Sequence, residues 1–345
     1  MNISQESIFS SALRSFFTAT FAIFGIFAGI IPVLILIGAF ISSAGELAPT
    51  SVSTILPDDE GHRTLLPETS PVILQIDVQG IIGSRKLDSE IIRKQLQSSQ
   101  EGNLKDGRIK GILLSINSPG GTVVDSDGIY RTIKDYKEKY HIPVFAFIDG
   151  ICASGGMYVA SSADKIYTSN ISLVGSIGVM MQFMNLSQTL EKIGIESRTL
   201  IAGKNKDSMN PLRPWGKGEE QSYQKLISFF YERFVNIVTE SRPKIDKELL
   251  IKEYGAQVFS AKEALDFGFI DESNYERSDA LKALAKEAGI QDEKYQVVQI
   301  QTGHWLHDFI ESRSPLITGK LSHDLQIGPN LEEHITNQFM YLYTP

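Results

Sequence analysis

The 26 residues from Phe16 to Ile41 contain no charged side chain, and this run constrains the chain more than any other sequence feature. At 1.5 Å per residue it would form a helix of about 39 Å, which exceeds the roughly 30 Å hydrocarbon core of a bilayer. A cleaved secretory signal ending near Ser42 is the alternative, but the apolar part of such signals usually runs for only about 7–15 residues. We therefore expect residues 16–41 to be an uncleaved transmembrane anchor.

The basic residues around this run predict its orientation. Arg14 lies just before it, and the first basic residue after it is Arg63. Because the more basic flank of a membrane helix usually stays in the cytoplasm, we expect residues 1–15 to be cytoplasmic. The rest of the chain would then lie outside the cytoplasm, at the cell membrane. Residues 42–70 are rich in Ser, Pro, Gly and acidic residues without sustained periodicity, which predicts a flexible stalk.

A layered α/β domain with largely parallel strands is predicted for residues 71–290. Three apolar runs are near-continuous rather than alternating, as expected of strands covered on both faces, and amphipathic segments between them predict helices. The runs are residues 71–82, 109–117 and 142–149, and the segments are 87–99 and 124–140. Further helices are expected at 185–194, 219–242 and 260–268, a strand at 196–202, and a C-terminal extension without assigned structure at 291–345.

Charge and composition exclude several functions. The formal net charge is −8, and no stretch interleaves Lys or Arg with aromatic residues, so nucleic acid is not an expected partner. Cys152 is the only cysteine, which rules out an intrachain disulfide and a cysteine-based zinc cluster. His304 and His307 are three residues apart, but a metal site on so short a segment is not expected. We therefore expect neither a metal nor a cofactor.

The first chemical signal is a glycine turn, Asn117–Gly121, at the end of the predicted strand 109–117. Ligands bind at the carboxyl ends of strands in α/β sheets. The paired Gly120 and Gly121 would let bare N–H groups approach a substrate carbonyl, as an oxyanion hole requires. Taken alone, however, a Pro-Gly-Gly sequence is more often only a turn.

A second glycine turn, Gly150–Gly156, follows the next predicted strand and places Ser154 at the start of an apolar helix. Serine is also a favoured N-cap there, so position alone favours a structural role. Two glycine turns that leave consecutive strands should nevertheless meet at one sheet edge. This arrangement predicts Ser154 as a nucleophile, with backbone N–H groups of Gly155 and of Gly120 or Gly121 as oxyanion donors.

A nucleophilic serine needs a base, and none of the six histidines lies in a glycine-rich loop. A lysine can serve when burial lowers its pKa. Moving that pKa from about 10.4 to near neutrality corresponds to roughly 4–5 kcal/mol, so the site should be enclosed and apolar. The loop Gly203–Pro211 offers Lys204 and Lys206, and their spacing does not decide between them.

Four segments in this order make the chain similar to signal peptide peptidase A, also called protease IV: NSPGG, CASGGMYVASSADKIY, SLVGSIGVMM and AGKNKDSMNP. A later segment, EALDFGFIDE, resembles the helix and strand that end the core of this family. The resemblance extends from about residue 71 to residue 290. It implies the fold shared with ClpP and the crotonases.

The resemblance also implies site residues and an activity. The family's serine nucleophile falls on Ser154 and its lysine base on Lys206, whereas Lys204 matches a non-catalytic position. Ser176 matches the serine that hydrogen-bonds the catalytic lysine, a role that suits a hydroxyl beside an uncharged amine. The implied protein is a membrane-anchored serine endopeptidase that degrades cleaved signal peptides and other apolar unfolded peptides.

Two departures and three alternatives accompany this interpretation. Asn205 stands where the family is expected to have a bulky residue, and the chain carries a single copy of the core. A single copy implies a homo-oligomeric ring or dome, with the dyad within or between neighbouring chains. The alternatives are a related membrane serine peptidase that cleaves a partner membrane protein, an inactive membrane scaffold, and a crotonase-like acyl-CoA enzyme.

Overall fold

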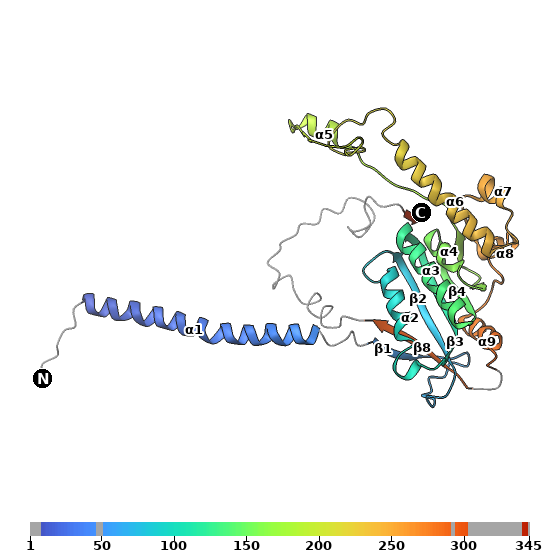
Figure 1. Ribbon diagram of the computed structural model, residues 1–345, viewed down its shortest axis with the longest axis horizontal. Helices are drawn as coiled ribbons and strands as arrows, with labels where there is room; N and C mark the ends of the chain where they lie inside the picture. The colour runs from blue at the N-terminus through green and yellow to red at the C-terminus, as the bar shows by residue number, and fades with distance from the viewer. Residues whose placement is uncertain (1–7, 46–50, 291–293, 303–339, 344–345) are drawn as a thin grey trace. The chain divides into compact units, whose positions relative to one another are not determined.

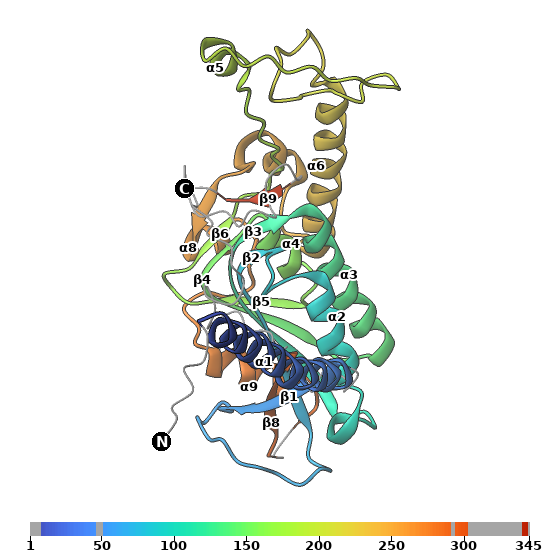
Figure 2. The same ribbon diagram turned by 90° about the vertical axis from the view of Figure 1, so that its left-hand side faces the viewer.

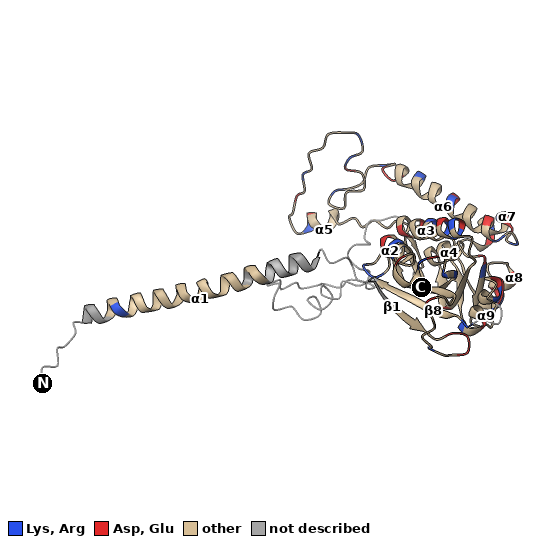
Figure 3. Ribbon diagram, turned by 60° about the horizontal axis from the view of Figure 1, so that its bottom comes forward, with Lys and Arg blue, Asp and Glu red and all other residues tan. Residues whose placement is uncertain are grey.

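The computed structural model describes residues 8–45, 51–290, 294–302 and 340–343, which belong to two compact units, Met1–Thr50 and Ser51–Pro345 (Figure 1). The first unit contains the helix α1, Ile8–Gly45. Its stretch Ala12–Val33 is long and apolar enough to cross a membrane, with a mean hydropathy of 2.1. In the coloured part of α1, Figure 3 shows one basic position near the N-terminal end and otherwise uncharged residues. The predicted segment 16–41 thus lies within one continuous helix.

Two hydroxyl groups of α1 are satisfied within the helix. Thr18 donates to the carbonyl of Arg14 and Thr20 to that of Phe16, each at 2.8 Å. A hydroxyl that bonds its own helix in this way needs no water, which suits a helix in hydrocarbon.

The second unit is built on one nine-stranded sheet with the order β1-β8-β2-β3-β4-β6-β7, in which β5 also pairs with β4 and β9 with β3. All neighbours are parallel except β1 with β8, β6 with β7 and β3 with β9. The predicted largely parallel α/β domain is therefore confirmed. The strands are β1 Ser51–Leu56, β2 Val72–Ile82, β3 Ile109–Thr122, β4 Val144–Ala153, β5 Lys165–Thr168, β6 Leu173–Gly175, β7 Val258–Ser260, β8 Gln296–Thr302 and β9 Met340–Leu342.

Helices cover both faces of this sheet, and the strand side chains alternate between them. Leu74, Ile112 and Ala146 belong to the core on the face of α2, α3 and α4. Ile73 and Phe145 pack instead with residues of α9 (Figure 1). Burial on both faces explains why the strands read as near-continuous apolar runs. The helical elements are α2 Ser89–Ser98, η1 Gly102–Leu104, α3 Val123–Tyr140, α4 Gly155–Ala160, α5 Ser187–Lys192, α6 Gln221–Ser241, α7 Lys247–Leu249, η2 Leu250–Tyr254, α8 Ala261–Asp266 and α9 Arg277–Glu287.

The domain extends beyond its predicted limits of 71 and 290. Within the predicted stalk 42–70, β1 forms an edge of the sheet, and the carbonyl of Pro57 accepts a hydrogen bond of 2.8 Å from Arg277. From the predicted C-terminal extension, β8 lies between β1 and β2, and β9 joins the end of β3. These strands are short or partly polar, so their strand state depends on partners far away in the chain.

The segment 181–220, which we call the arm, differs most from the prediction. Figures 1 and 2 show it beyond the N-terminal end of α6, apart from the strands of the sheet. The predicted helix 185–194 is present as α5, but the predicted strand 196–202 has no strand partner among the described residues. Leu200 in this segment is 87% exposed. An apolar run becomes a strand only beside another strand, and the described part of a single copy offers none here.

Candidate active site

The two glycine turns meet at the carboxyl ends of β3 and β4. These strands are parallel neighbours, with Ser118 in register with Cys152. A Cβ added to Gly120, whose φ is 105°, would lie 2.7 Å from the backbone nitrogen of Gly155. One added to Gly155 would lie 3.1 Å from the nitrogen of Gly121. Only glycine permits so close an approach of the two backbones, and the expected convergence of the turns is observed.

Ser154 lies at the start of α4 in a strained conformation, with φ 54° and ψ −116°. It is 1% exposed, and its N–H donates to the carbonyl of Gly175 at 2.8 Å. Although the residue occupies the N-cap position, its side chain makes no capping hydrogen bond. A strained backbone and an uncommitted hydroxyl are features of a functional serine rather than of a helix cap.

Ser176 is the second predicted serine, and it lies close to Ser154 along the sheet edge. The strands β4 and β6 are parallel neighbours with Ala153 in register with Gly175, so each serine directly follows a paired residue. Ser176 is buried, has a φ of 56°, and donates its N–H to the carbonyl of Gln257 at 2.6 Å. Both predicted serines therefore have left-handed backbones, which for residues other than glycine often mark functional sites.

The candidate oxyanion donors differ in what they already bond. The N–H of Gly120 donates to the hydroxyl of Ser118 at 3.1 Å, and that hydroxyl donates to the carbonyl of Gly80 at 2.6 Å. Gly155 is the first residue of α4, where backbone N–H groups have no partner within the helix. The nitrogen of Gly121 lies close to Gly155, and Gly121 is itself paired with Tyr341 of β9.

An extended segment of the chain itself, β9, runs beside both turns (Figure 2). It pairs antiparallel with the end of β3, with Gly121 opposite Tyr341. On its other side, Met340 and Met180 exchange two backbone hydrogen bonds of 3.0 Å. The backbone carbonyl of Tyr341 would contact a Cβ on either Gly120 or Gly155. The sequence patterns did not indicate this strand, which comes from the predicted extension 291–345.

The side chain of Tyr341 fills an aromatic pocket below these turns. It is fully buried, with its ring centroid 5.0 Å from that of Tyr158 and 4.6 Å from that of Phe234. Its hydroxyl donates to the carbonyl of Phe230 at 3.0 Å. Burial raises the pKa of the Tyr341 phenol, so it stays protonated as a donor. The pocket therefore accepts a large aromatic side chain and offers one hydrogen-bond acceptor.

The structure does not bring Lys206 to Ser154 within one chain. Lys206 and Lys204 are exposed residues of the arm, whereas Ser154 is buried at the sheet edge (Figure 1). The enclosed apolar surroundings that a neutral lysine needs are thus not supplied by the arm of a single copy.

The loop that carries Lys206 is organised by three charged residues outside the predicted site. Arg213 donates to Asp207 at 2.6 Å and to both carboxylate oxygens of Glu219, at 2.8 and 3.0 Å. Glu219 also accepts the N–H groups of Met209 and Gly216, at 3.1 and 2.6 Å. Hydrogen bonds from Arg213 lower the pKa of Asp207 and hold that of Glu219 at about 2.

Acid should therefore loosen this loop only well below neutral pH. A carboxylate with a lowered pKa contributes stability above its ordinary value of 4.5, and the contribution is lost as pH falls toward about 2. Trp215 reports on the loop, because its indole N–H donates to the carbonyl of Asn210 at 2.8 Å. In a Trp305→Phe chain, where Trp215 is the only tryptophan, its emission should stay constant from pH 7 to 5 and change between 4.5 and 2.

Glu219→Gln is the control for this titration, because it cannot form the same carboxylate pair and should remove the acid transition. A transition centred between pH 5 and 7 would contradict the assignment to Asp207 and Glu219.

Among the described residues, no group of three or more His, Cys, Asp and Glu side chains could hold a metal. His304 and His307 lie outside the described residues.

Comparison with known proteins places the chain among peptidases. The model of Peptidase family S49 matches residues 135–291, which include Ser154, Ser176 and Lys206. A Synechocystis protein provisionally named a protease is 32% identical over 262 residues, which cover 75% of this chain and 86% of that protein.

Two further relatives match a shorter part of their length. A Methanocaldococcus jannaschii protein provisionally named a protease is 36% identical over 61% of this chain and 65% of that protein. An Enterococcus faecium protein provisionally named signal peptide peptidase SppA is 31% identical over 64% of each. The chain thus covers just under two thirds of these two relatives. Among solved structures, a ClpP1 mutant from Listeria monocytogenes has a TM-score of 0.40 and 21% identity, over 60% of this chain and 94% of that chain.

Proposed function

Because the chain belongs to peptidase family S49, we propose that it is a membrane-anchored serine endopeptidase with Ser154 as nucleophile and Lys206 as base. The resemblance that the sequence motifs indicated is confirmed at the level of this family. One observation carries the proposal: a buried serine with a strained backbone and no capping bond lies beside an extended strand of peptide, β9.

In the proposed reaction, the hydroxyl oxygen of Ser154 attacks the carbonyl carbon of a peptide bond, and its proton passes to the neutral amine of Lys206. The oxyanion that forms accepts hydrogen bonds from the N–H group of Gly155 and from that of Gly120 or Gly121. In the structure both glycines of the first turn have a neighbour within the chain, Ser118 for Gly120 and Tyr341 of β9 for Gly121. The lysine then protonates the leaving amine, and water releases the acyl group from Ser154. Ser176 orients the lysine amine.

We infer that the lysine of one copy serves the serine of a neighbouring copy in a homo-oligomeric ring or dome. The support is that Lys206 lies on the exposed arm, while Ser154 is buried at the sheet edge. Seven large apolar side chains of the arm are exposed, as expected of a surface that contacts a partner: Met184, Leu186, Ile193, Ile195, Leu200, Ile201 and Leu212.

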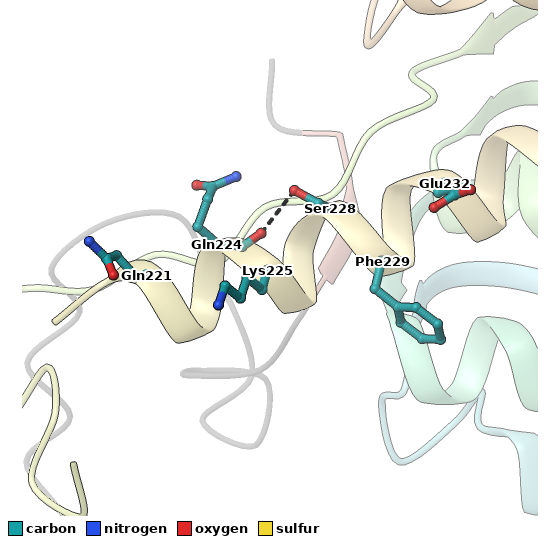
Figure 4. A pocket seen from close by; sticks show the side chains of 6 residues that line it. All are labelled: Gln221, Gln224, Lys225, Ser228, Phe229 and Glu232. Atoms are coloured by element: carbon teal, nitrogen blue, oxygen red, sulfur yellow. Dashed lines mark hydrogen bonds between the residues drawn. The ribbon is translucent and has the colours of Figure 1, made fainter. Parts of the chain in front are cut away.

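The adjoining part of α6 is exposed as well. Figure 4 shows the side chains that line a hollow of about 530 Å³ along this helix, among them Phe229, which is 60% exposed. The hollow is lined by Gln221, Gln224, Lys225, Ser228, Phe229 and Glu232. A mixed polar and aromatic surface of this kind suits contact with a second copy.

We propose apolar, extended peptides as substrates, with cleaved signal peptides as the main source. β9 supports an extended mode of binding, because it adds a strand to β3 through backbone pairing and inserts Tyr341 into an aromatic pocket. Folded proteins cannot offer such a strand. The apolar helix α1 supports a location at the cell membrane, with the catalytic domain outside the cytoplasm.

Peptide libraries test this proposal. The purified full chain should cut a signal-peptide library at apolar stretches and leave a folded protein intact. It should cut a charged library at least about tenfold more slowly, because charged side chains lose hydration in an apolar pocket. Mass spectrometry maps the cuts, and Ser154→Ala is the control. Equal cleavage of both libraries would refute the apolar preference. Failure to react with a serine-directed phosphonate would instead indicate an inactive scaffold, and binding of acyl-CoA would indicate a crotonase-like enzyme.

A further inference from the structure

We propose that Arg213 is a positioning residue that holds Lys206 in the place and charge environment from which it serves Ser154. The inference rests on the proposed dyad. Lys206 lies in a loop that pairs with no strand among the described residues, so side-chain contacts have to define its position.

The backbone of this loop is weakly held by its own hydrogen bonds. The N–H of Lys206 donates to Gly203 at 3.4 Å and that of Ser208 to Asn205 at 3.2 Å, both at or beyond the long end of the usual range. Asn205 and Met209 have left-handed backbones, with φ of 62° and 59°. Asparagine tolerates this conformation better than most residues, which gives a physical reason for Asn205 beside the lysine. Such conformations persist only where other contacts enforce them.

Arg213 supplies these contacts in the middle and at the end of the segment between Asn205 and Met209. Its guanidinium donates to the carboxylate and to the backbone carbonyl of Asp207, the residue that follows Lys206. It also binds Glu219, which accepts the N–H of Met209. The planar guanidinium of Arg213, together with Glu219, thus connects positions 207 and 209 to the residues just before α6. A lysine could not make these bonds together, because its ammonium lacks the fork geometry.

Arg213 also balances the charge near Lys206. Asp207 and Glu219 are both ionised at neutral pH, since hydrogen bonds from Arg213 lower the pKa of each. Without the guanidinium, Asp207, which follows Lys206 in the chain, and Glu219 would both lose their positive partner, and the added negative charge in this loop would favour a protonated amine. The other charged side chains of the segment 203–220 are the exposed Lys204, Lys217 and Glu220. The neighbouring segments bond to it through Asn185, Leu186 and Thr199, and they also carry Arg198 beside Thr199.

The test compares charge and geometry in the full chain. Arg213→Ala should lower kcat by about a hundredfold, which is the effect of misplacing a catalytic group by about 1 Å. KM should change less than about threefold, because the variant leaves the peptide-binding groove unaltered. It should raise the apparent pKa of the kcat/KM profile. Arg213→Lys should restore this apparent pKa but only part of kcat. Asp207→Asn should lower the apparent pKa, because it removes a negative charge. Lys217→Ala, an exposed cation of the same loop, is the matched control.

Opposite shifts of the apparent pKa in Arg213→Ala and Asp207→Asn would support the inference. If Arg213→Ala does not fold or assemble, the shift of the apparent pKa in Asp207→Asn is the deciding measurement. Gel filtration and thermal unfolding verify that each variant is folded and assembled. Unchanged pH profiles in folded, assembled variants would overturn the positioning role while leaving the dyad intact, provided that Lys206→Ala is inactive. Activity retained by Lys206→Ala would refute the dyad itself and the inference with it.

Discussion

Replacing Ser154 with alanine should lower peptide hydrolysis by at least about a thousandfold, the scale of losing a nucleophile, while the chain stays folded. The serine side chain makes no capping hydrogen bond, so its loss should cost less than the roughly 0.5–2 kcal/mol of a true N-cap. Alanine at the same left-handed backbone carries the same strain as serine. Hydrolysis of an apolar peptide and the thermal unfolding midpoint are the two measurements.

Ser162→Ala is the matched control, because Ser162 is buried just beyond the other end of α4 and bonds the carbonyl of Val159 at 2.7 Å. It should keep its activity even if it unfolds at a somewhat lower temperature. Substantial cleavage by folded, purified Ser154→Ala would show that another group is the nucleophile.

Replacing Lys206 with alanine should be as damaging as replacing Ser154, and the double variant should be no worse, because nucleophile and base act as one unit. Lys204→Ala should retain most of the activity. Lys204 is a suitable control, because both lysines are exposed in the same loop of the arm and are only two positions apart. If the two variants exchange these phenotypes, the base is Lys204.

Mixing inactive chains tests whether the lysine comes from a neighbour. When Ser154→Ala and Lys206→Ala chains assemble at random in equal amounts, about a quarter of the interfaces combine an intact serine with an intact lysine, and activity should return to about that fraction. No recovery in verified mixed assemblies would contradict a dyad formed between chains.

Much of the fold was predictable because its signals are local. The strands β2, β3 and β4 are read from apolar runs whose continuity reflects burial on both faces. The helix α3 begins where Thr122 accepts the N–H of Asp125, a capping pattern visible in the sequence. The turn that carries Ser154 was predictable for the same reason. Its strand, its glycines and its helix follow one another directly in the sequence, so the whole signal is local.

Distant pairing was not predictable from patterns of this kind. The strands β1, β8 and β9 are short or polar, and they become strands only because the sheet offers an edge to each. The Arg213 network joins residues six positions apart in an irregular loop, where no helical or strand period marks a contact. The sequence by itself determined the membrane-length helix, the parallel core and the serine at its edge, because each depends on neighbouring residues. Only the tertiary structure decided that β9 lies beside that serine and that Lys206 lies away from it on the arm, because both depend on where long connections bring the chain.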